Sequence, residues 1–436
     1  MRKKLSQVFE NVLAYSKYFL ILFAFVILIV IVYNSAYCKN HITSQSYDGK
    51  SLVSEKSKIS SGFNLISTIG SYSNLYGKGK VQLVDMFGKG VHEWTTKFRP
   101  FYGILEKNGN LIVALFNTEE KLPPGNTGII QELDWNGDVV WQYKNNQLRL
   151  DFDVLPNGNI AALLTEKVPK NISSKIKGGT PSPEDYKGDI TAEAIVEINR
   201  SGNISWMWHS YEHLDADKDS IGPYTLRFYW PLINSVKYVK EDPFYKEEAY
   251  LISMRNLNTI ALVKKKDGSF IWKSPKSMLS FQHDPTLLEN GDILVFDNNV
   301  YRKPEITDPY NWIGSRVIEI NPKTNEIVWE FSSGIGLDNA RFKAEITSGA
   351  QRLKNGNTLI VNGPQGELFE VTPSGELVWS LINPHTVKGI LSPWNANSFF
   401  KARRYYAEDI SRLQNIGNGM PMLSIMCVKI RNLILN

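Results

Sequence analysis

Cysteine is scarce in this chain of 436 residues, and the two present, Cys38 and Cys427, lie near opposite ends. Two cysteines exclude a disulfide framework, and their positions give no reason to expect that they pair. No Cys-x-x-Cys spacing and no cluster of histidine with cysteine occurs, so the pattern typical of a zinc site is missing. We therefore expect no metal ion.

A strong excess of one charge and a long helical pattern are also lacking. The 49 lysine and arginine residues stand against 44 aspartate and glutamate residues, and the net charge of +5 is too small to indicate a nucleic-acid partner. The basic run at 264–266 falls within a predicted hairpin turn. Between Gly49 and Trp394 no extended stretch repeats with the helical period, and glycine and asparagine interrupt the sequence throughout. These absences favour an all-β protein.

Six tryptophans recur at intervals of 47 to 66 residues, and each ends a similar segment. The segments are VDMFGKGVHEW (Trp94), QELDWNGDVVW (Trp141), VEINRSGNISW (Trp206), LVKKKDGSFIW (Trp272), IEINPKTNEIVW (Trp329) and FEVTPSGELVW (Trp379). In each, two runs of apolar and polar residues flank a turn rich in glycine, asparagine, aspartate or lysine. This is the pattern of a β-hairpin, repeated six times.

A second kind of hairpin alternates with the first. Its segments are LEKNGNLIVAL (105–115), LPNGNIAALL (155–164), LENGDILVF (288–296) and LKNGNTLIV (353–361). Each has Asn-Gly at the turn, which is the strongest short-range signal for a hairpin. The region 225–263 is less regular, and in it we expect the inner pair of strands at 233–239 and 250–263.

A repeat of this period is typical of a β-propeller, whose four strands per repeat need about 40–45 residues. We predict an all-β fold, a six-bladed β-propeller over residues 76–410. In this arrangement the Asn-Gly hairpins are the inner strands of the blades. The tryptophans should lie in the outer half of each blade, packed between neighbouring sheets.

The longest apolar run begins at Tyr18 and, extended to Cys38, reaches the roughly 20 residues that cross a bilayer. Basic residues predominate before it, so the positive-inside rule places residues 1–17 in the cytoplasm and the propeller on the periplasmic or extracellular side. We predict a single-pass transmembrane signal anchor at 18–38 in the cell membrane. A cleaved signal peptide is the alternative, although the residues around Cys38 make a poor cleavage site.

Two further segments flank the predicted propeller. Residues 39–75 are rich in serine and lysine, and we predict that they form a stalk leading into the first blade. Residues 411–436 form a C-terminal tail that does not continue the repeats and ends in the apolar stretch MPMLSIMCVKIRNLILN. A closing strand, an interfacial helix and a partner surface are open alternatives for this tail. Nothing in the sequence indicates the oligomeric state.

The function of a propeller depends on the side chains near its central axis, at the ends of the innermost strands. Among the histidines, His283 lies a few residues before an inner-hairpin strand, beside Asp284. A lone histidine is more often a structural residue than a catalyst. Position alone therefore leaves both interpretations of His283 open.

Five segments between about Val81 and Tyr406 point to a known family. They are SFQHDPTLLENGDILVFDNN, SRVIEINPKTNEIVWEF, SGAQRLKNGNTLIV, GELFEVTPSGELVW and FFKARRYY. In this order they resemble the bacterial arylsulfotransferases, which are exported β-propeller enzymes that move a sulfuryl group between phenols without the usual nucleotide sulfate donor. The resemblance implies an aryl sulfate and a phenol as substrates, no cofactor, and transfer through a sulfohistidine.

The resemblance also implies roles for individual residues. His283, in an intact Gln-His-Asp, matches the nucleophile, and Arg255, in LISMRNLNTI, matches the arginine that holds the sulfuryl oxygens. Sulfuryl transfer spreads negative charge over those oxygens, so cations aimed at them stabilise the transition state. A neutral imidazole is a competent nucleophile near pH 7. The residues expected to bind substrate are Arg149, Asp151, Asn234, Gln282 and Asp284.

Two positions depart from the family pattern. Family members usually have His-His-Asp where this chain has Arg149-Leu150-Asp151, and a histidine before Ile-Asn-Ser, where this chain has Leu232. Leucine can neither transfer a proton nor bind an oxyanion. Loss of one oxyanion donor typically slows a reaction about 10²–10³-fold. Arg149 can hold sulfate-like oxygens but cannot act as a general base.

Two functions follow as hypotheses. The first is an aryl sulfotransferase whose acid–base group is His209, His213 or a tyrosine. The second is a catalytically degenerate propeller that binds a ligand or another protein outside the cytoplasm. A quinone-dependent dehydrogenase propeller is a weaker alternative, because the Gly-Thr-Trp repeats typical of those proteins are absent from the sequence.

Overall fold

The computed structural model describes residues 51–53, 57–69, 77–181, 189–300, 314–332, 343–385 and 397–414. The predicted cytoplasmic segment 1–17 and transmembrane segment 18–38 lie outside these ranges, as does most of the C-terminal tail. Within the described ranges, no helix has both the length and the apolar character needed to cross a membrane.

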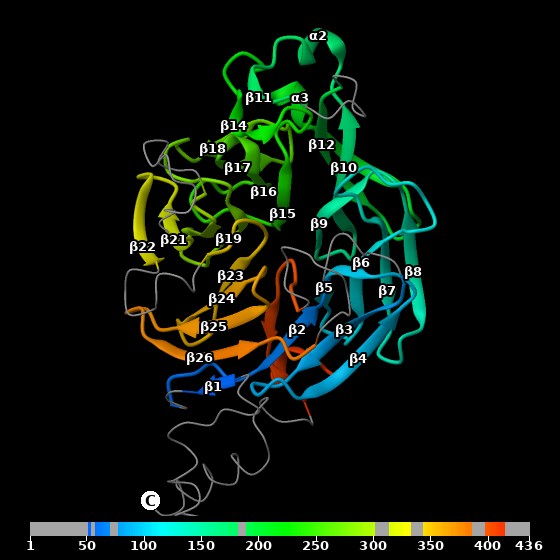
Figure 1. Cartoon of the computed structure of the whole chain (residues 1–436), viewed down its shortest axis with the longest axis vertical. Helices are drawn as coiled ribbons and strands as arrows, with labels where there is room; N and C mark the ends of the chain where they lie inside the picture. The colour runs from blue at the N-terminus through cyan, green and yellow to red at the C-terminus, as the bar shows by residue number, and fades with distance from the viewer. Residues whose placement is uncertain are drawn as a thin grey trace, which may run out of the picture.

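Six antiparallel sheets surround a central axis in the described part of the chain (Figure 1). From the axis outward, blade 1 contains β27 (Arg403–Tyr405), β2 (Phe63–Ser67), β3 (Gly79–Val84) and β4 (Gly90–Thr96); in the same direction, blade 2 contains β5 (Pro100–Leu105), β6 (Leu111–Phe116), β7 (Gly128–Leu133) and β8 (Val139–Lys144). Blade 3 contains β9 (Leu148–Val154), β10 (Ile160–Lys167), β12 (Thr191–Ile198) and β13 (Ile204–His209); blade 4 contains β15 (Ile233–Val239), β16 (Ala249–Met254), β17 (Thr259–Lys264) and β18 (Phe270–Lys273). Blade 5 contains β19 (His283–Leu287), β20 (Ile293–Asp297), β21 (Arg316–Asn321) and β22 (Glu326–Ser332); blade 6 contains β23 (Gly349–Arg352), β24 (Thr358–Asn362), β25 (Glu367–Val371), β26 (Leu377–Ile382) and β1 (Ser51–Val53). The predicted six-bladed β-propeller is confirmed.

The two kinds of hairpin occupy the places that the sequence predicts. The Asn-Gly hairpins join the two inner strands of blades 2, 3, 5 and 6, and the tryptophan hairpins join the two outer strands. In blade 3 the inner turn closes with a bond of 2.8 Å from the N–H of Gly158 to Leu155 O. Gly158 has a φ of 81°, which glycine adopts without steric cost.

Blade 4 differs from its prediction in one respect. The segment 250–263, expected as one strand, is divided into β16 and β17 by the 3₁₀ turn η2 (Arg255–Leu257). The turn ends at Asn258, whose φ of 52° lies in the left-handed region that asparagine tolerates. The division matters for function, because it places Arg255 at the end of a hairpin rather than within a strand.

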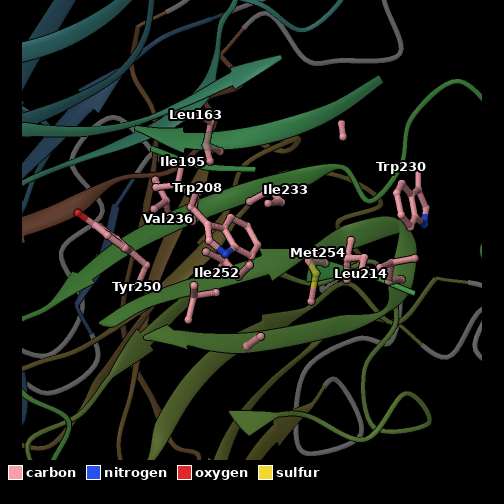
Figure 2. Packing of buried hydrophobic residues seen from close by; sticks show 14 of the residues in the cluster. Leu163, Ile195, Trp208, Leu214, Trp230, Ile233, Val236, Tyr250, Ile252 and Met254 are labelled. Atoms are coloured by element: carbon pink, nitrogen blue, oxygen red, sulfur yellow. The ribbon is translucent and has the colours of Figure 1, made fainter. Parts of the chain in front are cut away.

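Neighbouring blades pack through six apolar clusters, one at each junction around the ring. Figure 2 shows the junction of blades 3 and 4, where Ile195 and Trp208 meet Val236 and Ile252. Full burial of such aliphatic side chains contributes about 1.5–3 kcal/mol each. The ring is therefore held mainly by contacts between sheets.

The six repeated tryptophans also link the blades by hydrogen bonds. Each lies on an outer strand and donates its indole N–H to the outer turn of the next blade, at 2.8–3.2 Å. The pairs are Trp94 with Asp134 O, Trp141 with Arg200 O, Trp206 with Lys265 O, Trp272 with Asn325 Oδ1, Trp329 with Pro373 O and Trp379 with Met86 O. The last pair joins blade 6 to blade 1. The predicted position of these tryptophans is confirmed.

Strands from both ends of the chain close the ring. The C-terminal strand β27 pairs with β2 in blade 1, and the N-terminal strand β1 pairs with β26 in blade 6. The predicted stalk at 39–75 is therefore wrong for at least 51–53 and 63–67, which are strands of the propeller. The apolar residues of β2 explain this, since Phe63, Leu65 and Ile66 are all buried in the clusters beside blade 1.

Short elements outside the blades cover their edges. The parallel strands β11 (Gly178–Thr180) and β14 (Ile221–Leu226) and the helical turns α2 (Lys170–Ser173) and α3 (Ser210–His213) lie beyond blades 3 and 4 (Figure 1). Near the C-terminus, the 3₁₀ turn η3 (Ala407–Asp409) leads to Ile410 and Leu413, which are buried in the cluster between blades 1 and 2. The first residues of the predicted tail are thus part of the propeller core.

Candidate functional site

The candidate residues lie on or beside the innermost strands of blades 3, 4 and 5. His283 is the first residue of β19, Asp151 lies in β9 and Asn234 in β15. Arg255 lies on η2, the turn between β16 and β17. The fold thus brings candidate residues from three different blades to the same side of the central axis, although they are spread over the sequence from Arg149 to Asp284.

The imidazole of His283 is buried and bonded at both nitrogens. Nδ1 lies 2.7 Å from Oδ1 of Asn298. The amide nitrogen of Asn298 donates to Ala344 O and Thr347 O, so its oxygen faces the ring and must accept. The proton of the neutral ring is therefore on Nδ1, and Nε2 carries the free electron pair, with the N–H of Thr347 at 3.2 Å as its partner.

The same surroundings keep His283 uncharged. Burial, reinforced by the positive charge of Arg255, lowers the pKa of His283 to about 3. The bond to Asn298 opposes this change only in part. Because the ring is neutral over the physiological pH range, it can act as a nucleophile or as a proton acceptor. It carries no second proton that it could donate as a general acid at the start of a reaction.

Arg255 is oriented by its own turn and by an aromatic ring. Its backbone N–H donates to Leu232 O at 2.9 Å, and Nη1 donates to Oδ1 of Asn256 at 3.0 Å. The guanidinium lies over the ring of Phe281, 4.1 Å from its centroid. Phe281 is two residues before His283, so Arg255 and the imidazole face the same short segment.

Gln282 and Asn234 hold the segment before His283 in place. Nε2 of Gln282 donates to Ser253 Oγ, Met254 O and Thr259 O at 3.0–3.2 Å. Nδ2 of Asn234 donates to the carbonyl oxygen of Gln282 at 2.9 Å. Both side chains are fully buried, so the geometry gives them a positioning role, whereas the sequence suggested substrate binding.

Asp151 and Asp284 are engaged by two cations that the sequence alone did not single out. Lys401 Nζ lies 2.8 Å from the carboxylate of Asp151 and 3.1 Å from that of Asp284. Nη2 of Arg403 lies 2.6 Å from both oxygens of Asp284. Burial alone would raise the pKa of Asp284, but Arg403 and Lys401 outweigh it and hold that pKa below its usual range. Both cations belong to FFKARRYY, and the family resemblance of this segment was the only sign in the sequence that they could belong to the site.

Arg149 forms a separate buried pair. Its Nε lies 3.3 Å from Oε1 of Glu193, its Nη1 donates to Pro124 O at 3.1 Å, and its guanidinium lies 4.5 Å from the centroid of the Tyr229 ring. Burial, opposed by Arg149, raises the pKa of Glu193 to about 7. Nothing in the sequence pattern singled out Glu193.

The two leucines that depart from the family pattern stand at the starts of inner strands. Leu150, in β9, has a φ of 47°, and Leu232, just before β15, has a φ of 57°. Such left-handed conformations are strained for leucine, by roughly 1–3 kcal/mol. Leu232 is buried and Leu150 half-buried, so each presents an apolar surface beside Arg149 or Arg255.

The two histidines suggested as acid–base groups lie elsewhere. His209 is the last residue of the outermost strand β13, where its Nδ1 lies 2.7 Å from Oε2 of Glu166. His213 ends α3 and stacks on Trp208 at 5.0 Å. Neither histidine lies on an innermost strand, since β13 is the outermost strand of blade 3 and α3 directly follows it. A tyrosine does reach the axis: the ring of Tyr102, in β5, lies 4.4 Å from Lys401 Nζ.

The fold and site define a six-bladed β-propeller with a buried, neutral histidine and an arginine near its axis. The family model for arylsulfotransferase (ASST) matches residues 152–384, more than half of the chain, and the protein belongs to that family. His283 and Arg255 lie within the matched residues. No curated protein is similar enough in sequence to be counted as a relative.

Solved structures match this chain only at low similarity. A protein of unknown function from Bacteroides caccae is 13% identical over 74% of this chain and 94% of its own, with a TM-score of 0.44. Apo AztD from Citrobacter koseri is 9% identical over 79% of this chain and 99% of its own, with a TM-score of 0.40. The inactive virginiamycin B lyase of Staphylococcus aureus is 13% identical over 74% of this chain and 86% of its own, with a TM-score of 0.36. These similarities are too low to bear on function.

Proposed function

We propose that this protein transfers a sulfuryl group from an aryl sulfate to a phenol through a sulfohistidine at His283. The observation that carries the proposal is the state of the imidazole. Asn298 accepts from Nδ1, which leaves the electron pair on Nε2, and the low pKa keeps that pair unprotonated. A ring partnered by a neutral amide rather than a carboxylate is less basic and better suited to attack than to proton storage.

In the first step, the Nε2 electron pair forms a bond to sulfur while the bond from sulfur to the aryl oxygen breaks. The aryl oxide leaves with the electron pair of the broken sulfur–oxygen bond and is protonated by water. In the second step, a phenol oxygen attacks the sulfur, the Nε2–S bond breaks and the electron pair returns to the ring. The phenol proton passes to solvent, so the histidine is regenerated.

Arg255 supplies charge stabilisation in both steps. Its guanidinium is held over Phe281, close enough for its charge to act on His283, and such a cation stabilises the developing charge on the sulfuryl oxygens. The N–H of Thr347, now bonded to Nε2, becomes a donor for a sulfuryl oxygen once sulfur occupies the electron pair. Thr347 has a φ of 57° and Ser348 a φ of 85°, so this segment is held in a strained form.

Without an acid–base imidazole at the positions of Leu150 and Leu232, substrate chemistry must compensate. A donor whose aryl oxide is stable needs no proton to leave, and an acceptor phenol of low pKa needs no base. We therefore propose that nitrophenyl sulfates and acidic phenols are the better substrates.

The propeller is proposed to act outside the cytoplasm. The apolar run at 18–38 and the basic residues before it favour a single-pass anchor with the propeller on the periplasmic or extracellular side. Protease added to intact cells or spheroplasts should digest the propeller while the N-terminal segment stays protected. Recovery of a full-length chain after this treatment would show the opposite orientation, with the propeller on the cytoplasmic side.

Mass spectrometry after incubation with 4-nitrophenyl sulfate tests the reaction. The peptide that contains His283 should gain one SO₃ group, and adding a phenol should remove it. His283→Ala should abolish the adduct, and Arg255→Ala should slow its formation about 10²–10³-fold while leaving the fold intact. An adduct that persists in His283→Ala would assign the nucleophile elsewhere.

A non-catalytic binding function is the second candidate. It is favoured by two observations, the engagement of both imidazole nitrogens of His283 and the apolar residues Leu150 and Leu232. In that case wild-type protein forms no adduct. A phenol or aryl sulfate would still bind, with an affinity unchanged by His283→Ala.

A further inference from the structure

Six charged side chains, three of them buried and three half-buried, meet at the axis of the propeller and form what we call the axial charge cluster. Its carboxylates come from β9 and β19 and its cations from β15 and the segment 401–403; the members are Asp151, Asp153, Asp284, Lys237, Lys401 and Arg403. Opposite charges are equal in number, which is the condition under which buried ions are tolerated.

Lys401 is the member that spans the axis. Its side chain has no exposed surface, and its Nζ joins Asp151 of blade 3 to Asp284 of blade 5. Burial lowers the pKa of Lys401, and the two carboxylates offset this only in part. An ammonium group at this position must keep both partners, because an unpaired buried charge costs about 3–5 kcal/mol.

The same segment forms a wall beside the histidine. The ring of Phe400 meets that of His283 edge to face, with centroids 6.3 Å apart. The carbonyl oxygen of Phe400 accepts from the N–H of Ser348 at 2.9 Å, next to Thr347, whose own N–H reaches Nε2. Residues 400–403 therefore contact His283 both directly and through its neighbours.

Asp284 follows His283 in the chain, yet within the described residues its hydrogen bonds go to Lys401 and Arg403. Its φ of 53° turns the backbone sharply at this point. Gly349 leaves room for the carboxylate, since a Cβ there would lie 2.2 Å from Oδ2. Lys401, Arg403 and the space beside Gly349 together fix the position of the Asp284 carboxylate. The side-chain partner of the imidazole is therefore the neutral amide of Asn298.

We propose that Lys401 is a positioning residue for His283: with Arg403 it holds the Asp284 carboxylate away from the imidazole, so that Asn298 remains the partner of Nδ1 and Nε2 keeps its electron pair. A carboxylate released from these cations would stabilise the imidazolium and convert the nucleophile into a base. The catalytic consequence rests on the proposed sulfuryl transfer, whereas the effect on the ring does not.

The groups whose charges bear on His283 define the expected sign. Arg255 of η2 lowers its pKa, and Asp284 raises it. The other charges of the cluster act on Asp284 or on one another. They belong to Lys401 and Arg403 of the segment 401–403, Lys237 of β15 and Asp151 of β9. Removing the charge of Lys401 leaves an excess negative charge beside the ring, so the pKa of His283 must rise.

The test follows the protonation of His283 by ¹³Cε1-histidine NMR on the full chain, with the resonance assigned by its loss in His283→Ala. Wild-type protein should show no midpoint from pH 8 down to about 4, whereas Lys401→Met should show one at about pH 4–6. Lys401→Arg keeps the charge and should behave as wild type. The adduct-forming rate of Lys401→Met should fall on acidification from pH 7 to 5, while that of wild type stays level.

Arg404→Met is the matched control. Arg404 is the next residue after Arg403, its side chain is as fully buried as that of Lys401, and it pairs with Glu370, but it lies between blades 1 and 6. It should lose comparable stability without changing the titration of His283. The double variant Lys401→Met with Asp284→Asn removes both charges and should restore the wild-type titration of His283. It provides a second measurement if Lys401→Met alone does not fold.

The absence of a midpoint above about pH 4 in folded Lys401→Met, or the appearance of one in Arg404→Met, would overturn the positioning role. A shifted midpoint in protein that forms no sulfuryl adduct would support the positioning role and refute the proposed transferase. The two ideas therefore fail separately.

Discussion

Acidification should destabilise this protein through His283, by an amount that the structure sets. The folded ring has a pKa of about 3, whereas the unfolded ring keeps the ordinary 6.5. A histidine whose pKa is depressed on folding stabilises the protein above the unfolded value, and this contribution is lost as the pH falls below 6.5 toward 3. Between pH 7 and pH 5 the unfolded chain takes up the proton and the folded chain does not, which costs about 2 kcal/mol.

Urea unfolding at pH 7 and pH 5, for wild type and for His283→Gln, isolates this contribution. Glutamine does not titrate, so the wild type should lose about 2 kcal/mol more than the variant over the same interval. Other groups that titrate, Glu193 among them, are present in both proteins and cancel in the difference. Equal losses in the two proteins would show that the imidazole is not buried in neutral form, and the tautomer argument for a nucleophile would fall with it.

Three further predictions concern the ring and the site. Trp379→Phe removes the indole donor that closes blade 6 onto Met86 O and should lower the free energy of unfolding by about 1–3 kcal/mol, whereas Trp329→Phe, at a more exposed bond, should cost less; circular dichroism in urea measures both. Leu150→His with Leu232→His should raise the adduct-forming rate and broaden the range of phenols used, if the missing imidazoles limit the reaction; an unchanged rate would remove them from the mechanism. Burial raises the folded pKa of Glu193 from 4.5 to about 7, so the stability that neutral Glu193 contributes at low pH is lost as the pH rises from about 4.5 to about 7; over this interval the stability difference between Glu193→Gln and wild type should shift in favour of the variant in the same unfolding assay.

Local patterns in the sequence were sufficient to predict the architecture. The hairpin turns and the recurring tryptophans are signals of short range, and each repeat needs the same neighbours, so six copies imply six blades. The tryptophans were placed correctly because an outer strand lies beside the next blade. There a large amphipathic ring can bury its face and donate its N–H to the outer turn of that blade. The N-terminal end of the propeller was placed less well, because β1 and β2 do not carry the repeat pattern and were assigned to the stalk.

The site was only partly accessible to the same reasoning. His283 was selected because it precedes an inner strand, and Arg255 because a family pattern carried it. The tautomer of His283, by contrast, depends on Asn298, the residue directly after β20, whose orientation is set by Ala344 and Thr347. No spacing in the sequence connects these residues.

What the sequence by itself determined is the repeated unit, the number of blades and the presence of one candidate nucleophile near the axis. Only the tertiary structure decided the state of that nucleophile. Lys401 lies 117 positions after Asp284 and 250 after Asp151, and ring closure alone brings the three together. The physical reason is that charge and burial act through space: the protonation of a buried group depends on every charge within a few ångströms, wherever those residues lie in the chain.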